Sequence, residues 1–179
     1  MGFNFERNLP HQDKAVQAVV ETFKEVSINR RKNSMCNPEF YLKDSNLIRN
    51  IKTIQEQNEI QDGQPVVNPF FNLDIKMETG TGKTYTYTKT LFELNKEYDI
   101  NKFIILVPTI PIKLGTEQFL KSPSTRLHFK EQYGKEISLE VLNSKNKSKK
   151  KKEHFPLGVP SGKCGFTTLR SFARRFPCF

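Results

Sequence analysis

Apolar side chains recur with helical spacing in the first third of the chain. Residues 13–26 carry four of them on one face: Val16, Val19, Val20 and Phe23. This spacing predicts an amphipathic helix. A second helix is expected at about residues 45–57, because Asp44 or Ser45 can cap it. Its apolar face consists of Leu47, Ile48, Ile51 and Ile54. The polar residues 27–43 between the two helices predict an irregular connection.

The centre of the chain predicts a β-α-β unit. Apolar residues alternate over 71–77, as in a strand with one buried face, and a helix is expected over 83–95. Its expected inward side chains are Tyr87, Leu91 and Leu94. An uninterrupted apolar run over 103–107, ended by Pro108, is typical of a parallel strand that is buried on both faces. This succession predicts an α/β fold with a right-handed crossover.

The rest of the chain divides at about residue 143. A further helix is expected within 116–133 and a strand over 137–142, which completes a domain of residues 1–143. Residues 145–152 then contain six lysines, a composition typical of a solvated loop, with a DNA-facing patch as the alternative. Residues 154–179 contain no acidic residue and no sustained periodicity. We therefore expect residues 144–179 to be a disordered basic tail.

Composition narrows the possible partners. The 179 residues suit one domain, and the net charge of +10 suits a polyanion partner. No long apolar run and no secretion signal pattern are present. We therefore expect a cytoplasmic protein that does not associate with a membrane. The three cysteines are far apart and lack a CxxC pairing, which argues against structural zinc or a disulfide framework.

The most specific motif lies between the first expected strand and its helix. It reads Thr-Gly-Thr-Gly-Lys-Thr over residues 79–84. Glycines allow a sharp turn in which successive N–H groups converge on phosphate oxygens at a helix N-terminus. Lys83 is expected on the β- and γ-phosphates of ATP, and the Thr84 hydroxyl on Mg²⁺. The predicted nucleotide-binding residues are Gly80, Thr81, Gly82, Lys83 and Thr84. Met77 replaces the first glycine of the general pattern, as in helicase-type NTPases.

Together with its flanking segments, this motif resembles the start of the helicase-like Res subunit of type III restriction–modification systems, which are superfamily 2 helicases. The stretches that carry the resemblance are Asn4–Gln12, Asn50–Glu56, Met77–Asn95 and Phe103–Pro108. The likeness extends from about residue 3 to about residue 157. It implies a RecA-like P-loop NTPase domain with an incomplete parallel sheet and flanking helices.

The resemblance also implies an activity, cofactors and partners. The family is an ATP-dependent site-specific deoxyribonuclease that acts on double-stranded DNA with a modification (Mod) methyltransferase subunit, using ATP and Mg²⁺. Gln12 resembles the glutamine that hydrogen-bonds the adenine edge, and Thr109 resembles a helicase motif that touches the DNA backbone. A surface glutamine and an ordinary helix cap remain the alternatives. The DNA-facing patch would consist of Lys149, Lys150, Lys151 and Lys152.

Other parts of the family's machinery are missing from this sequence. ATP hydrolysis in the family requires an Asp-Glu-x-His box, but no Asp follows Asp99, and Glu140 lies in mid-strand without a preceding Asp. A second RecA-like lobe and a nuclease domain are also missing. We therefore expect an N-terminal fragment that is inactive alone and has no catalytic residue of its own. A frameshift at the adenine-rich lysine codons is one hypothesis for its origin.

Two other functions are alternatives for this sequence. A GTPase needs an Asn-Lys-x-Asp motif, but residues 95–98 read Asn-Lys-Glu-Tyr, which disfavours this class. A non-catalytic, basic nucleic-acid-binding product stays open, because the lysine tract and the missing acidic box both favour it.

Overall fold

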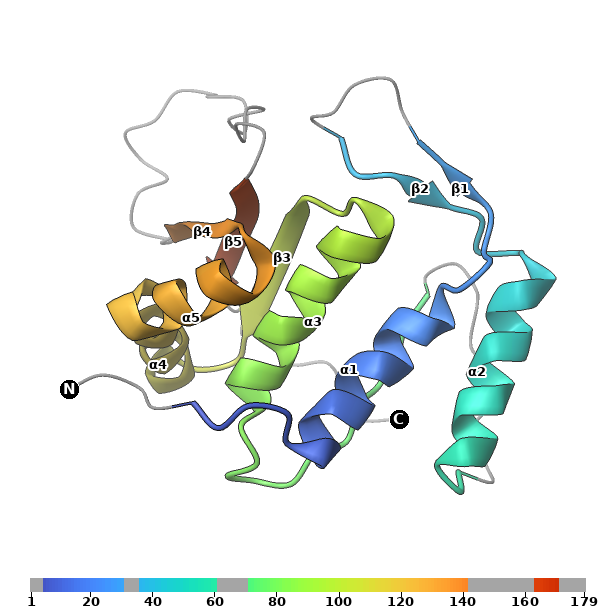
Figure 1. Ribbon diagram of the computed structural model, residues 1–179, viewed down its shortest axis with the longest axis horizontal. Helices are drawn as coiled ribbons and strands as arrows, with labels where there is room; N and C mark the ends of the chain where they lie inside the picture. The colour runs from blue at the N-terminus through green and yellow to red at the C-terminus, as the bar shows by residue number, and fades with distance from the viewer. Residues whose placement is uncertain (1–4, 31–35, 61–70, 142–162, 171–179) are drawn as a thin grey trace. The chain divides into compact units, whose positions relative to one another are not determined.

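The computed structural model describes residues 5–30, 36–60, 71–141 and the backbone of 163–170 (Figure 1). It divides into two compact units. One consists of Glu6–Ile100, and the other of Asn101–Phe179 together with Met1–Phe5. The predicted phosphate loop and Gln12 belong to the first unit, whereas Thr109 belongs to the second.

The unit Glu6–Ile100 is built on three helices, α1 (Pro10–Thr22), α2 (Ser45–Gln57) and α3 (Lys83–Tyr98). In Figure 1, α1 lies between α2 and α3. The apolar residues at its centre come from all three helices: Val16, Val19, Leu47, Tyr85, Phe92 and Leu94. The two predicted N-terminal helices are confirmed. On α3, Leu94 is buried as expected, but the deepest apolar side chain is Phe92, which is 1% exposed.

The segment that joins α1 to α2 is more regular than its polar sequence predicted. It contains the short antiparallel pair β1 (Ile28–Asn29) and β2 (Glu39–Phe40). Phe23 packs against Phe40 with ring centroids 4.8 Å apart, and both rings contact Tyr98 of α3. Aromatic contacts therefore hold this connection against α3. The polar composition of the segment alone does not predict them.

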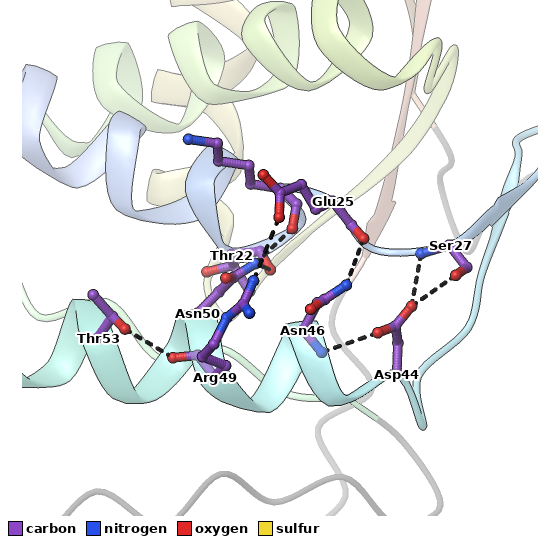
Figure 2. Close-up of polar contacts among 9 residues, drawn as sticks. Thr22, Glu25, Ser27, Asp44, Asn46, Arg49, Asn50 and Thr53 are labelled. Atoms are coloured by element: carbon purple, nitrogen blue, oxygen red, sulfur yellow. Dashed lines mark hydrogen bonds and ion pairs between the residues drawn. The ribbon is translucent and has the colours of Figure 1, made fainter.

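Polar contacts fix the start of α2 to the segment that follows α1 (Figure 2). The Asp44 carboxylate caps α2 by accepting a hydrogen bond from the Asn46 backbone N–H at 2.9 Å. It also accepts hydrogen bonds from the backbone N–H and hydroxyl of Ser27, at 2.9 and 2.8 Å. Asn50 donates to the Lys24 carbonyl oxygen at 2.7 Å. The predicted Asp44 cap is confirmed, and it also holds two segments together.

The strand predicted over residues 71–77 is not formed. Phe71 makes an isolated β-bridge, and residues 72–77 have no regular structure. Leu73 and Ile75 are 37% and 45% exposed. Alternation predicts a strand only where a neighbouring strand supplies backbone hydrogen bonds, and no described strand pairs with residues 72–77.

The second unit contains a parallel sheet. Its strands are β3 (Lys102–Val107), β4 (Glu136–Val141) and β5 (Lys163–Arg170), in the order β3-β5-β4. Phe103 of β3 lies opposite Phe166, and Ile137 of β4 opposite Cys164. The helices α4 (Ile110–Lys121) and α5 (Pro123–Tyr133) connect β3 to β4. Their apolar core is formed by Phe119, Leu120, Phe129 and Ile137. The predicted α/β character is confirmed.

Two expectations about this sheet are wrong. Residues 163–170 were expected in a disordered tail, yet β5 is the central strand. A central parallel strand is held by backbone hydrogen bonds on both edges, which do not require periodicity in its own side chains. β3 was expected to be buried on both faces, but Ile104 and Leu106 are 60% and 67% exposed. The lysine tract Lys149–Lys152 lies outside the described residues.

Candidate nucleotide-binding site

The predicted phosphate loop is a tight turn that leads directly into α3. Gly80 and Gly82 have φ values of 86° and 81°, in the left-handed region that favours glycine. Gly82 is the N-cap of α3, and no side chain caps this end of the helix. The first N–H groups of α3 are therefore available to an anion, and the partial positive charge of the helix terminus favours one.

Two side chains of the loop fold back onto its beginning. Lys83 Nζ donates to the carbonyl oxygen of Glu78 at 2.5 Å, and the Thr81 hydroxyl donates to the same oxygen at 2.7 Å. Lys83 is the first residue of α3 and is exposed, and Thr84 follows it in the first turn. The sequence therefore brings the predicted phosphate and Mg²⁺ ligands together at one helix terminus.

The start of α1 contacts this loop. Gln12 is 6% exposed, and its Nε2 donates to the Thr81 carbonyl oxygen at 3.0 Å. His11 Nε2 lies 3.2 Å from the same oxygen and acts as a donor, because a carbonyl only accepts. A Cβ on Gly82 would lie 2.5 Å from Gln12 Nε2 and would displace this amide, and its positive φ also favours glycine. Gln12 was predicted at the site, whereas His11 was missed.

An ion pair with one buried member lies next to this contact. Lys89 of α3 is 7% exposed, and its Nζ lies 2.6 Å from a carboxylate oxygen of Asp13 in the first turn of α1. Burial raises the pKa of Tyr85, on which both members of the pair also act electrostatically. No local sequence pattern marks Asp13 or Lys89 as special, because a lysine in an amphipathic helix is usually solvated.

The groove between α1 and α3 is a poor alternative for a nucleotide. It has a volume of about 290 Å³ and contains no residue of the phosphate loop. Its charged lining residues are Asp13, Glu21, Lys89, Glu93 and Glu97. Four carboxylates against one lysine would repel a triphosphate. The candidate site is therefore the loop itself.

Thr109, the residue predicted to touch the DNA backbone, belongs to the other unit. Thr109 is the N-cap of α4, where its hydroxyl oxygen accepts a hydrogen bond from the Ile112 N–H at 3.5 Å. This geometry favours the helix-cap interpretation. Across the described ranges, no group of three His, Cys, Asp or Glu residues could hold a metal ion, which leaves Thr84 as the one predicted protein ligand. Nor do those ranges contain a helix of the length and hydropathy that would cross a membrane.

The chain is similar to proteins of one family. A model of the type III restriction enzyme, res subunit, matches residues 7–161, which include Gln12 and the phosphate loop. The chain is 45% identical over 164 residues to the type III restriction-modification enzyme EcoPI Res subunit of Escherichia phage P1, and 43% identical over 164 residues to the EcoP15I Res subunit of Escherichia coli. Each alignment covers 88% of this chain and 17% of the relative.

A more distant relative covers a similar part of the chain. The StyLTI Res subunit of Salmonella typhimurium is 32% identical over 151 residues, which are 83% of this chain and 13% of that protein. This chain thus spans about a sixth of the length of the EcoPI and EcoP15I relatives and about an eighth of the length of the StyLTI relative. The matched region and the identities together show that the chain belongs to the type III restriction enzyme Res subunit family.

Proposed function

We propose that this chain forms the ATP·Mg²⁺-binding part of a helicase-like, superfamily 2 Res subunit, in a RecA-like domain. The observation that carries the proposal is the glycine-flanked loop at the uncapped N-terminus of α3, with Lys83 and Thr84 in the first helical turn. As in other Res subunits, double-stranded DNA and a Mod methyltransferase subunit are the proposed partners.

In this proposal the loop binds the phosphates through its backbone. The N–H groups from Thr81 to Thr84 donate to phosphate oxygens, and the positive end of α3 stabilises their charge. Lys83 Nζ would give up its hydrogen bond to the Glu78 carbonyl oxygen and donate to β- and γ-phosphate oxygens instead. The Thr84 hydroxyl would be a ligand of Mg²⁺. When bound, Mg²⁺ neutralises charge on the phosphates.

Gln12 is proposed to read the base. Its amide already touches the loop through Thr81, so a base beside it would be adjacent to the bound phosphates. A side-chain amide offers a donor and an acceptor in one plane, which suits the N7 and amino group of adenine.

Titration with ATP and Mg²⁺ tests the proposal. Lys83→Ala should weaken binding by about 10- to 150-fold, since a hydrogen bond to a charged group contributes about 1.5–3 kcal/mol. Lys96→Ala is the matched control: Lys96 lies in the last turn of α3 and pairs there with Glu93 and Glu97. Equal ATP affinity in the wild type and Lys83→Ala would contradict the assignment.

We further propose that the 179-residue chain binds ATP without turning it over. Phosphoryl transfer needs an acid that orients the metal and water and a charge that stabilises the transition state. No Asp follows Asp99 in the sequence. A DNA-stimulated ATPase rate that is lost in Lys83→Ala would show that another acid, such as Glu140, replaces the missing box.

A second candidate function is basic nucleic-acid binding without catalysis. The net charge of +10 favours it, because phosphate contacts dominate sequence-independent affinity for DNA. DNA binding that Lys83→Ala leaves unchanged, in a chain that does not bind ATP, would favour this second function.

A further inference from the structure

The ion pair between Asp13 and Lys89, of which only the lysine is buried, has no part in the function proposed so far. The side chain of Lys89 is 9% exposed and that of Asp13 is 29% exposed. Removing an ammonium from water is costly, and a buried pair often adds little net stability over apolar residues. One documented use of such pairs is to fix a particular geometry. The relevant question is therefore which geometry this pair fixes.

The pair connects the first turn of α1 to the helix that carries the phosphate loop. Asp13 directly follows Gln12, and Lys89 lies six residues after Lys83 on α3. Gln12 donates to the Thr81 carbonyl oxygen at 3.0 Å, and its Nε2 would lie 2.5 Å from a Cβ built on Gly82. The ion pair thus holds the backbone beside Gln12, at a place where a small displacement would break the amide contact.

The Thr81 carbonyl also decides which way the Gln12 amide faces. A carbonyl oxygen accepts only from the NH₂ group, so Nε2 faces the loop. Among the described residues, neither the second Nε2 hydrogen nor Oε1 has a hydrogen-bond partner. The amide therefore presents a donor beside an acceptor.

This orientation discriminates between purines. Adenine offers an acceptor at N7 beside a donor at N6, which complements the oriented amide. Guanine offers acceptors at both N7 and O6, so Oε1 would face another acceptor. A Gln12 that is no longer held could rotate and would lose this preference.

We propose that Asp13 and Lys89 are positioning residues for Gln12, and that their ion pair thereby sets a preference for adenine over guanine nucleotides. The inference rests on the proposed ATP-binding function. It predicts an effect on base selectivity that is separate from phosphate binding, because the ion pair joins the first turn of α1 to a position on α3 six residues after Lys83.

The test is to measure the affinities of ATP, GTP and inorganic tripolyphosphate for a set of variants. Lys89→Met keeps the length of the side chain but removes its charge. It should lower the ATP/GTP affinity ratio by about 3- to 10-fold, the value of one net hydrogen bond. Its tripolyphosphate affinity should stay within about 2-fold of wild type. Lys89→Arg should restore the ratio.

Two further variants provide a control and a substitute for Lys89→Met. Tyr98→Phe is the matched control: it removes a 2.7 Å hydrogen bond to the Val20 carbonyl, which joins the same two helices far from Gln12. Its ATP/GTP ratio should equal that of the wild type. If Lys89→Met does not fold, Asp13→Glu keeps the charge but shifts the carboxylate by one methylene, and it should also lower the ratio.

The outcomes separate this inference from the proposed function. A wild-type ratio in a folded Lys89→Met or Asp13→Glu variant that binds ATP would overturn the positioning role and leave ATP binding intact. An equal loss of selectivity in Tyr98→Phe would also overturn it, since any loosening of α1 would then suffice. Failure of the wild type to bind either ATP or tripolyphosphate would overturn both.

Discussion

Lys83 Nζ donates a hydrogen bond to the carbonyl oxygen of Glu78, five residues earlier in the chain. The Thr81 hydroxyl donates to the same oxygen, so one backbone carbonyl holds both the loop and its lysine. A phosphate that binds Lys83 must therefore replace an existing hydrogen bond. The gain in binding energy is the difference between the new and the old hydrogen bond, which is smaller than the energy of the new bond alone, so the effect of Lys83→Ala should fall toward the lower end of the range of about 10- to 150-fold.

Alanine at Gly82 should be more damaging than alanine at Gly80. Both glycines have left-handed φ, which costs an L-residue about 1–2 kcal/mol. Only at Gly82 would the new Cβ meet another group, since Gln12 Nε2 would lie 2.5 Å away, whereas Gly80 faces open space. Gly82→Ala should therefore lower both the urea midpoint and the ATP affinity further than Gly80→Ala does.

A third variant identifies the cause of this difference. In a Gln12→Ala background the clash partner is absent, so Gly82→Ala and Gly80→Ala should have similar effects on stability. If Gly82→Ala stays the more damaging substitution there, the close approach of Gln12 is not the reason that this position requires glycine.

Core burial on α2 predicts a contrast between two neighbouring residues. Leu47 is fully buried, whereas Ile48 is 36% exposed. Leu47→Ala should reduce the free energy of unfolding by about 2–5 kcal/mol, because it leaves a cavity in the core. Ile48→Ala should cost less than about 1 kcal/mol. Chemical denaturation of both variants measures the difference, and similar losses would mean that α2 does not pack through Leu47.

Features that depend on short-range interactions were predicted correctly from the sequence, whereas features that depend on distant segments were not. The Asp44 cap and the first two helices depend on neighbours within a few residues, so local patterns predicted them, but Ile48, which was expected on the apolar face of α2, is 36% exposed. Strand pairing depends on distant segments. For this reason, residues 71–77 were given a strand that is not formed, and β5 was missed although it has two strand neighbours.

The candidate site shows the same limit. The loop residues and Gln12 were predicted from a motif and a family resemblance. Their contact spans 69 positions in the sequence and is visible only in the structure. Nothing local distinguishes Lys89 from a solvated lysine, because its burial depends on the approach of Asp13, which lies 76 positions away.

Acid should weaken the contact between Asp44 and Ser27. Hydrogen bonds from the Ser27 backbone, the Asn46 backbone and the Ser27 hydroxyl lower the pKa of Asp44 below that of an ordinary aspartate. A lowered folded-state pKa means that the stabilisation is present above the unfolded pKa and is lost as pH falls through the folded one. Asp44→Asn should therefore be less stable than the wild type at pH 7, with a gap that narrows below about pH 4.

Urea midpoints at several pH values between 7 and 3 measure this gap. Ser27→Ala serves as a partial variant, because it removes the hydroxyl donor at 2.8 Å and keeps the backbone donor at 2.9 Å (Figure 2). Its loss of stability at pH 7 should be smaller than that of Asp44→Asn. A gap between wild type and Asp44→Asn that is constant from pH 7 to pH 3 would refute the role of the carboxylate charge.

DNA binding should depend on salt through the lysine tract. Each phosphate that a lysine neutralises releases counterions, so the logarithm of the binding constant falls with the logarithm of salt concentration by about 0.9 per contact on duplex DNA. Replacing Lys149–Lys152 with glutamine should flatten that slope by up to about 3.6. The affinity should be independent of DNA sequence, because phosphate contacts carry no base information.

A control variant with the same change of charge distinguishes direct contacts between the tract and DNA from an effect of the protein's net charge. Four exposed lysines of the other unit, Lys14, Lys24, Lys43 and Lys52, can be replaced by glutamine together. If the tract binds DNA, this control should change the slope much less than the tract variant does. Equal slopes in the two variants would mean that only net charge matters. An unchanged slope in the tract variant would mean that the lysines are merely solvated, and Lys149–Lys152 would then have no role in DNA binding.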